Sequence, residues 1–408
     1  MLQSRIWGFS LPNSVWLAAE RGRGPIPAET DVVVVGGGLA GTALAYYLAR
    51  EGVDVVLLER GALNREASGT NAGSFHFQIA IHQLTARETA GSHERLLSDV
   101  RLHLRAAELW ATLEDELDGP LGVHRTGGLM VAQTPQELQL LHDKRLIEAE
   151  AGLETHVLEG PPLWEAAPYL NRRLLGATYC PAEGHANPFL AAPLFALRAS
   201  DLGAVVRTNV EVTAVEPGFV VGTPAGAIRA RRLVNAAGAW ANDLAALSGL
   251  RLPIRAEGLH VNVTEPRAKV LEPLLQHIGR RLTLKQAESG TFIIGGGWPA
   301  RPEPRPARYS TRWQSAAGNA AVAVDVMPEL AGVRLVRMWT GVMAFTDDLQ
   351  PVVGELDAMP GYFALIATTG FTLSPMIARM LAAHIARGEL LPPEYAPDRR
   401  PTPTTRGA

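Results

Sequence analysis

The stretch Asp31-Val-Val-Val-Val-Gly-Gly-Gly-Leu-Ala-Gly41 decides the fold. Its continuous run of β-branched residues predicts a strand that is buried on both faces. The glycines that follow fit the pattern Gly-x-Gly-x-x-Gly, which predicts a tight turn from a strand into a helix. That helix is expected over residues 39–51, and a second buried strand over 53–59. Together they make a βαβ unit of the kind that binds dinucleotides.

Each glycine of the pattern has its own task in such a site. Gly36 makes the turn, Gly38 lets the backbone approach a pyrophosphate, and Gly41 lets the helix pack against the strand. The N-terminus of the helix offers free amides and a partial positive charge to phosphates. Glu59 ends the second strand, where an acid accepts hydrogen bonds from ribose hydroxyls. The acid disfavours NADP, so NAD and FAD remain open at this point.

Composition excludes several other classes of protein. The 408 residues are too many for one ordinary core and predict two joined domains. A net charge of -3 without a basic block argues against a nucleic-acid surface. The single cysteine, Cys180, excludes an intrachain disulfide, and neither it nor the histidines have the spacing of metal ligands. We therefore expect no metal, and the use of cysteine fits a cytoplasmic protein.

One stretch has an alternative interpretation as a membrane span. Residues 32–49 carry no charge and are long enough to cross a bilayer. The glycines inside this stretch suit a strand, turn and helix better, and residues 1–24 lack the continuous apolar core of a signal peptide. We therefore expect no transmembrane segment.

Further elements are expected along the rest of the chain. Apolar residues at three- and four-residue steps predict an amphipathic helix over 97–117. Thr134-Pro-Gln-Glu137 is a capping box that begins a helix ending near Gly152. The remaining predicted elements are strands at 127–133, 233–239, 260–265, 291–295 and 361–367 and a helix at 374–387.

Five more motifs follow the glycine turn in order. They are Ser68-Gly-Thr-Asn-Ala-Gly-Ser74, Pro181-x-Glu-Gly184-x-x-Asn-Pro188, Ala236-Ala-Gly-Ala-Trp240, Pro351-Val-Val-Gly354 and Thr369-Gly-Phe-Thr-Leu-Ser374. This series resembles the D-amino-acid-oxidase (DAO) type of flavoprotein over residues 30–390. Leu284-Lys-Gln286 and Ile294-Gly-Gly-Gly-Trp298 resemble most the opine oxidase and hydrogen cyanide synthase type subunits, and sarcosine oxidase β-like and D-hydroxyproline dehydrogenase-like proteins are also similar.

The resemblance implies an α/β fold, in which a Rossmann-type FAD-binding domain adjoins a discontinuous α+β substrate domain with a mixed sheet, as in glutathione reductase and DAO folds. The predicted ranges are 28–90, 181–255 and 345–391 for the FAD-binding domain, 91–180 and 256–344 for the substrate domain, 1–27 for an N-terminal extension and 392–408 for a C-terminal tail.

The resemblance also implies FAD as the cofactor and oxidation of a carbon–nitrogen bond. A hydride would pass from the carbon beside nitrogen to the flavin, and the imine would hydrolyse. The helix expected near Ser374 would point its N-terminus at the flavin. The implied cofactor-binding residues are Gly36, Gly38, Leu39, Ala40, Gly41, Glu59, Arg60, Ser68, Asn71, Ala72, Gly73, Ser74, Val212, Ala237, Gly238, Trp240, Gly370, Phe371, Thr372 and Leu373.

This sequence departs from the family pattern where relatives hold a substrate carboxylate. Met343 and Thr372 stand where glycine oxidases and sarcosine oxidases carry an arginine and a lysine, and His76 aligns with a further arginine. A bidentate carboxylate clamp is what arginine makes best. A clamp would therefore come from Lys285, Arg337 or His260, or the substrate lacks that carboxylate.

Two more departures concern the flavin. Ile293 aligns with the lysine that promotes the reaction of sarcosine oxidases with oxygen, so we expect a dehydrogenase rather than an oxidase. The cysteine of covalent members falls near Gly341, so FAD should be noncovalent. Electrons would then leave through another carrier, which includes a partner subunit.

The catalytic candidates are His76, His260, Lys285, Trp339, Met343 and Thr372. Each has a structural alternative, such as strand packing for His260, a solvated strand end for Lys285 and core filling for Trp339. The alternatives for the whole protein are an FAD-carrying subunit of a heteromeric dehydrogenase, a flavin-bound protein without turnover, and an enzyme that uses only NAD.

Overall fold

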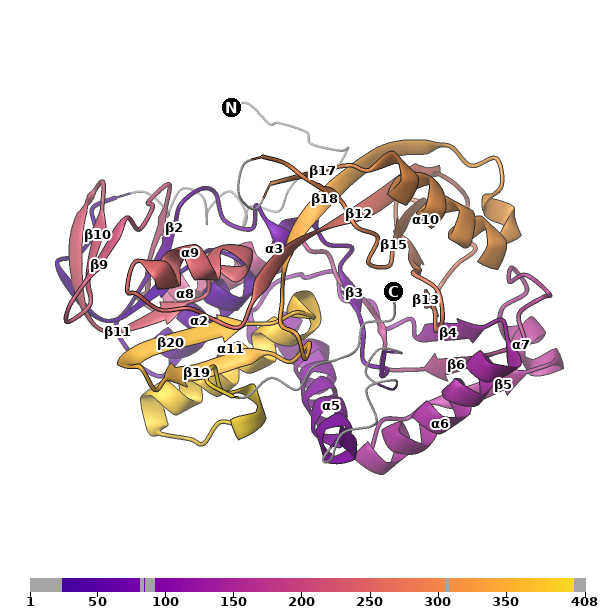
Figure 1. Ribbon diagram of the computed structural model, residues 1–408, viewed down its shortest axis with the longest axis horizontal. Helices are drawn as coiled ribbons and strands as arrows, with labels where there is room; N and C mark the ends of the chain where they lie inside the picture. The colour runs from indigo at the N-terminus through magenta and orange to yellow at the C-terminus, as the bar shows by residue number, and fades with distance from the viewer. Residues whose placement is uncertain (1–23, 81–83, 85–91, 305–307, 400–408) are drawn as a thin grey trace.

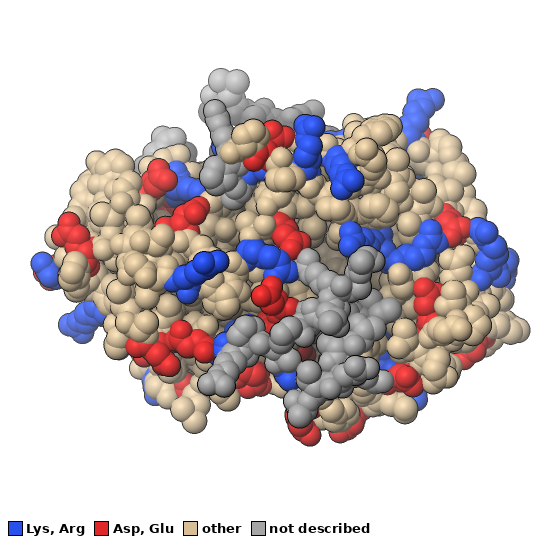
Figure 2. Space-filling view, in the orientation of Figure 1, with Lys and Arg blue, Asp and Glu red and all other residues tan. Residues whose placement is uncertain are grey.

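The computed structural model describes residues 24–80, 84, 92–304 and 308–399. The chain forms two lobes, each built on an 8-stranded sheet, with the helix α5 (Ser92–Glu116) between them (Figure 1). Lys and Arg are interspersed with Asp and Glu over the face in Figure 2, which agrees with the small net charge.

The first sheet has the strand order β19-β20-β11-β1-β2-β8, and β10 and β9 continue from β11. Its strands are β1 (Glu29–Val35), β2 (Val55–Glu59), β8 (Val205–Thr208), β9 (Ala214–Glu216), β10 (Val220–Thr223), β11 (Gly226–Asn235), β19 (Val352–Leu356) and β20 (Met359–Ile366). The five strands from β20 to β8 pair in parallel. Both faces are covered, because one core cluster contains Val32 and Val34 and another contains Val33 and Val35.

Three helices pack on one face of this sheet, namely α2 (Leu39–Arg50), α8 (Ala191–Asp201) and α11 (Gly370–Arg387). The predicted βαβ unit is therefore confirmed, with the second strand beginning at Val55 rather than at residue 53. The helix predicted over 374–387 begins at Gly370 instead. Gly370 and Pro375 concealed this first turn, because both residue types weaken a helical pattern in sequence.

The second sheet has the order β18-β12-β15-β14-β13-β4-β6-β5. Its strands are β4 (Gly128–Ala132), β5 (His156–Glu159), β6 (Gly176–Cys180), β12 (Arg255–Pro266), β13 (Leu274–His277), β14 (Thr283–Gln286), β15 (Thr291–Gly295) and β18 (Leu335–Phe345). The pair β13–β4 is parallel and the other pairs are antiparallel, so the sheet is mixed as expected. The helix α10 (Trp313–Val326) packs on one face of this sheet.

Two long helices join the lobes. The helix α6 (Pro135–Ala151) carries the predicted capping box, in which Thr134 accepts from the Glu137 amide and Gly152 ends the helix in a left-handed conformation. The predicted amphipathic helix is α5, which packs against α11, and Trp110 donates a hydrogen bond of 2.9 Å to the Thr372 carbonyl. Residues 92–116, which the sequence places in the substrate domain, thus share a core with the first lobe. The domain boundaries themselves remain a prediction.

Short elements complete the described chain. They are α3 (Ala67–Thr70), β3 (Ser74–Phe75), α7 (Pro161–Ala166), β7 (Gly184–His185), η1 (Gly238–Trp240), α9 (Ala241–Ala246), β16 (Arg301–Pro302), β17 (Tyr309–Ser310), η2 (Pro328–Leu330) and η3 (Pro393–Tyr395). The expected tail does not begin at residue 392, because Tyr395 is 1% exposed and Arg399 pairs with Asp348. The strand predicted to reach residue 239 ends at Asn235 and turns into η1.

Candidate functional site

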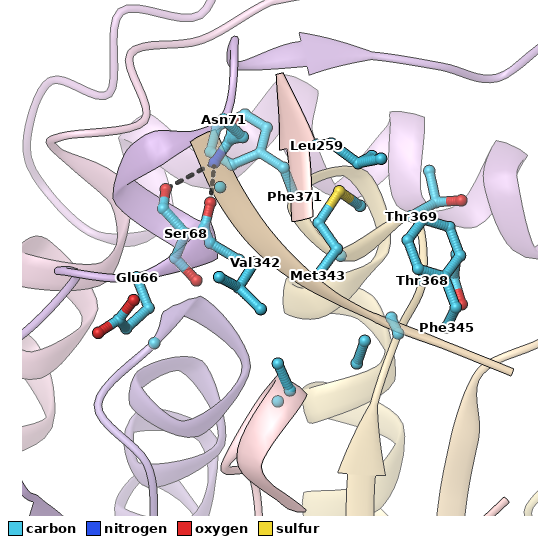
Figure 3. A pocket seen from close by; sticks show the side chains of 18 of the residues that line it. Glu66, Ser68, Asn71, Leu259, Val342, Met343, Phe345, Thr368, Thr369 and Phe371 are labelled. Carbon is cyan, nitrogen blue, oxygen red and sulfur yellow. Dashed lines mark hydrogen bonds between the residues drawn. The ribbon is translucent and has the colours of Figure 1, made fainter. Parts of the chain in front are cut away.

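A cavity of about 1340 Å³ lies between the two lobes. The glycine turn, the segment 66–74 and the first turn of α11 line one part of it, and residues of β12, β13 and β18 line another. Figure 3 shows Ser68 and Asn71 from the first lobe around the same space as Leu259 and Met343 from the second. The cavity is larger than a drug-sized ligand requires, so it can hold an extended molecule.

The glycine turn is packed too closely for any side chain. A Cβ on Gly36 would lie 2.4 Å from the Ala236 carbonyl oxygen, and Gly36 has a φ of +121°. A Cβ on Gly41 would lie 2.0 Å from the Gly36 carbonyl oxygen. The first and third glycines therefore have the structural tasks predicted for them, namely the turn and the close helix packing.

The N-terminus of α2 opens toward the cavity. Gly38 is its N-cap and supplies no side-chain cap, while the Ser68 hydroxyl accepts a hydrogen bond of 2.9 Å from the Leu39 amide. The first turn has no acidic residue, and Ala40 lines the cavity. This arrangement leaves a partial positive charge at the place where a pyrophosphate would lie.

Glu59 is held at the end of β2 by two backbone amides. Gly37 and Gly61 each donate to its carboxylate at 2.7 Å. Next to it, the Arg60 guanidinium lies 4.2 Å from the ring centroid of Trp240, and both residues line the cavity. The carboxylate is thus fixed where it can accept hydrogen bonds from ribose hydroxyls.

The segment after α3 is locked by the side chain of Asn71. Its amide donates to the carbonyls of Ala67 and Ser68 at 3.0 and 2.6 Å, and its oxygen accepts from the Gly73 amide at 2.6 Å (Figure 3). The next hydroxyl, Ser74 Oγ, is buried and has no hydrogen-bond partner among the described residues. Since buried polar groups are normally paired, this unpaired hydroxyl fits a bound molecule along the segment.

The N-terminus of α11 joins this segment to the next part of the chain. The Thr372 hydroxyl accepts from the His76 amide at 3.3 Å and lies 3.5 Å from the Ser74 carbonyl. Phe371 stacks on Phe75 with ring centroids 5.9 Å apart. Thr372 is therefore a tether between α11 and residues 74–76, as well as a residue that borders the cavity.

The structure brings most predicted site residues together around the cavity. Those that line it are Gly36, Gly38, Ala40, Glu59, Arg60, Ser68, Asn71, Ala72, Gly73, Ser74, His76, Val212, Ala237, Gly238, Trp240, His260, Met343, Gly370, Phe371 and Thr372. Predicted residues outside the lining are Leu39, Gly41, Lys285, Trp339 and Leu373.

Two catalytic candidates have contacts that point to structural roles. His260 borders the cavity, but its Nε2 lies 2.7 Å from the Asn262 oxygen, and the Asn262 amide donates to the Ala316 carbonyl of α10. Residues two apart on a strand share a face, so the His260 side chain lies on the α10 side of β12. The Trp339 indole donates to the Thr70 carbonyl at 2.7 Å and so ties β18 to α3.

Lys285 is not solvated, which was the structural alternative to a role in the site. It is 5% exposed, and its Nζ lies 3.3 Å from the position that a Cβ on Gly73 would occupy. Burial, with a further contribution from Lys269, lowers the pKa of Lys285 to about 7. It pairs across β14 and β15 with Ile293, the position at which the family resemblance expected a lysine.

Four residues in or behind the cavity were not among the site residues predicted from the sequence. His103, Gln276 and Arg281 line the cavity, and Glu183 lies just behind Gln276. Glu183 was part of the motif at 181–188, so a signal for it existed. His103 lies within the helix α5 and Gln276 within the strand β13. No sequence motif marks either residue, so only the folded chain shows that they lie at the site.

A parallel sheet that ends in this glycine turn, with an anchored acid and a cavity continuing to a second sheet, defines a dinucleotide-binding oxidoreductase. Residues 31–384 match the family described as "FAD dependent oxidoreductase" (DAO), and the chain belongs to this family. Its cofactor is therefore FAD, which decides between the two dinucleotides that the glycine turn left open.

Relatives and solved structures agree with this assignment. The chain is 30% identical over 373 residues to the B subunit of the opine oxidase of Rhizobium meliloti, covering 89% of this chain and 95% of that protein. It is 27% identical to the β subunit of the sarcosine oxidase of Rhodobacter capsulatus, covering 86% and 85%. The structure of an L-proline dehydrogenase from P. horikoshii matches the fold with a TM-score of 0.81 at 24% identity, covering 91% of this chain and 98% of that one.

The described residues contain neither a candidate membrane span nor a candidate metal site. None of their helices is both long and apolar enough to cross a bilayer. Within the same ranges, no three His, Cys, Asp or Glu side chains gather as they would around a metal ion.

Proposed function

We propose that this protein oxidises the carbon–nitrogen bond of a small amine or amino acid, with noncovalently held FAD as the hydride acceptor. The continuity of the cavity carries the proposal, because one space is lined by the glycine turn and by β12, β13 and β18. A substrate lying against the second sheet would thus meet a cofactor that enters along the first. FAD, when bound, supplies the hydride acceptor, and the protein supplies positioning and exclusion of water.

Apolar side chains form much of the wall on the second lobe. Leu259, Val342, Met343 and Phe345 lie around the space in Figure 3 together with Phe371. A wall of this kind excludes water and favours the neutral form of a bound amine, since a charge in apolar surroundings is costly. A neutral amine is the form from which a hydride can leave.

The means of holding a substrate carboxylate differs from the family pattern. Met343 and Thr372 line the cavity and carry no charge, and Arg337 lies outside it, 5.8 Å from the Trp339 ring centroid. Arg281, in the turn between β13 and β14, lines the cavity. We propose Arg281, which lines the cavity and is exposed, as the residue that would meet a carboxylate on the substrate.

We further propose that the enzyme is a dehydrogenase rather than an oxidase, and that its electrons pass to another carrier. Support comes from Ile293 at the position of the oxygen-promoting lysine. A lysine, Lys285, does lie opposite Ile293 on the neighbouring strand, so the test must include variants of both residues. A partner subunit is a candidate for the carrier, since two relatives are named as subunits of oxidases.

The test begins with the purified full chain, which should be yellow. Anaerobic addition of secondary amines, opines, imino acids and D-amino acids, one at a time, should bleach the flavin for at least one class. Acid precipitation should leave a colourless pellet. A chain that neither contains nor takes up a flavin would refute the proposal, bleaching by no compound would support a flavin-bound protein without turnover, and a yellow pellet would overturn noncovalent attachment.

The oxygen proposal has its own variants. Ile293→Lys should speed the reoxidation of reduced flavin by air, while the matched variant Ile293→Met should leave the rate unchanged. If Lys285→Met slows reoxidation in the otherwise unaltered protein, Lys285 already promotes the reaction with oxygen, and the case for a dehydrogenase fails.

A further inference from the structure

Behind the cavity lies a buried carboxylate that only accepts hydrogen bonds. Glu183 is fully buried, and its Oε1 accepts from the amides of Phe77 and Gln78 at 2.8 and 3.0 Å. Its Oε2 accepts from the side-chain amides of Gln78 and Gln276 at 2.9 and 3.3 Å. Burial raises the pKa of Glu183, and these donors oppose that rise. With donors on both oxygens and no acceptor for a proton among the described residues, the contacts are those of a carboxylate.

The orientation of Gln78 in this arrangement is fixed independently. The buried Lys144 ammonium donates to Gln78 Oε1 at 2.8 Å, and the Thr178 hydroxyl donates to the same oxygen at 2.7 Å. The Gln78 amide nitrogen must therefore face Glu183. The whole cluster is thus set in one pattern of donors and acceptors.

That pattern determines which nitrogen of His76 carries the proton. Gln276 turns its amide nitrogen to Glu183 and hence its oxygen to His76, where Oε1 lies 3.0 Å from Nδ1. An amide oxygen only accepts, so Nδ1 must donate. Burial lowers the pKa of His76 to about 4, so the ring is neutral near pH 7 and its Nε2 keeps a lone pair.

The Nε2 atom of His76 faces the cavity. His76 lines the cavity, the structure gives Nε2 no partner among the described residues, and Nε2 is not one of the buried unpaired atoms. His103 repeats the pattern on α5, because its Nδ1 lies 2.8 Å from the Asp99 carbonyl, which leaves its Nε2 as an acceptor too. His103 also lines the cavity.

We propose that Gln276 and Glu183 are positioning residues that hold His76 as a neutral hydrogen-bond acceptor for an N–H group of the substrate. A neutral imidazole with a bare Nε2 repels the oxygens of a carboxylate and attracts the N–H of an amine. The amine, rather than a carboxylate, thus occupies the place at which relatives are expected to carry an arginine. The proton position is a property of the chain itself, and the choice of an amine rests on the proposed function.

The proton position is tested by ¹⁵N NMR of the histidine rings in the full chain as purified, with His76 assigned from a His76→Asn spectrum. His103 and His277 are internal references of opposite kind, because His277 Nδ1 accepts from the amides of Gly279 and Arg280 at 3.0 and 3.1 Å. His76 should resemble His103, with a protonated Nδ1. A His76 ring that resembles His277 would overturn the proposal.

A variant of Gln276 separates positioning from mere packing. Gln276→Met should release His76 into a mixture of tautomers, because no acceptor remains opposite Nδ1. Gln133→Met is the matched control, since Gln133 is likewise half-buried and accepts a hydrogen bond from Arg280 but does not line the cavity. An unchanged tautomer in Gln276→Met would show that Gln276 does not set it. This readout requires neither flavin nor turnover, so it stands apart from the proposed function.

The ligand class is tested with simple cations followed through the His76 Nε2 signal. Dimethylammonium has N–H groups and tetramethylammonium has none, so dimethylammonium should bind about five-fold more tightly, the factor that one ordinary hydrogen bond supplies. His76→Leu should abolish the difference. Equal affinities, or a response of Nε2 to acetate alone, would refute an acceptor site for N–H groups.

Discussion

Two buried lysines in this protein have opposite surroundings. Lys144 on α6 is fully buried and donates to Glu148 at 2.8 and 2.9 Å and to Gln78 at 2.8 Å. Lys285 on β14 is 5% exposed, and the structure gives its ammonium no partner among the described residues. Both sites are similarly hidden from water, so burial alone does not account for the difference.

The difference separates a buried charge whose partners lie within the chain from a buried lysine that has no partner among the described residues. Around Lys144, the Glu148 carboxylate also accepts from the Ile79 amide and the Thr155 hydroxyl, so every charge is paired and the segment after His76 is held in place. Around Lys285, Ser74 Oγ and His185 Nε2 are also buried without partners among the described residues. An unpaired buried cation costs stability, so the two lysines should respond differently to replacement.

The largest loss of stability is expected from breaking the ion pair between Lys144 and Glu148. Lys144→Met should lower the free energy of unfolding by about 3–5 kcal/mol, because it leaves Glu148 buried and uncompensated. Chemical denaturation measures the loss. The pair Arg50–Glu116 at the surface, in which the Arg50 side chain is 51% exposed, supplies the control, and Arg50→Met should cost less than about 1 kcal/mol. Equal losses in the two variants would mean that burial of the pair is irrelevant.

Removing the unpaired charge of Lys285 should change the stability in the opposite direction. Lys285→Met should leave the stability of the chain without substrate unchanged or raise it by about 1–2 kcal/mol, since a buried charge without a partner is replaced by an apolar side chain of similar length. Thermal unfolding of the two proteins at pH 6.5 makes the comparison. A loss as large as that in Lys144→Met would show that Lys285 has a strong partner in the folded chain.

The same lysine predicts a dependence of stability on pH. The pKa of Lys285 is about 7 in the folded chain and about 10.5 when unfolded, so between these values the unfolded chain holds a proton that the folded chain has lost. Stability from this group therefore rises as the pH increases from about 7 to 10.5. The advantage of Lys285→Met over the parent should shrink across this window in denaturation curves. An advantage independent of pH would mean that Lys285 keeps an ordinary pKa.

The smallest effect concerns the helix that carries the paired lysine. Thr134→Ala removes the hydroxyl that accepts from the Glu137 amide and should cost about 1 kcal/mol. If this variant instead costs as much as Lys144→Met, then the loss in Lys144→Met reflects the helix α6 rather than its buried ion pair. Denaturation under the conditions used for Lys144→Met checks this.

The sequence predicted local elements well where one short stretch carries the whole signal. The turn at Gly36 and the capping box at Thr134 depend on neighbours along the chain, and both are present as expected. The start of α11 was missed because Pro375 interrupts its pattern. The burial of Tyr395 was missed because a polar, proline-rich composition does not reveal a docking surface elsewhere in the fold.

What the sequence determined by itself was the dinucleotide-binding domain, because a glycine turn and its anchored acid act through backbone geometry that few other residues can produce. The five further motifs, through their resemblance to a known family, indicated FAD and the class of chemistry. Only the tertiary structure decided which ionisable groups face the cavity and in what state. Glu183, Gln276 and His76 are far apart in the chain, and the proton position on the imidazole depends on their contacts across two lobes. Lys144 and Lys285 are the same type of residue, and they differ only in the groups that the fold places beside them.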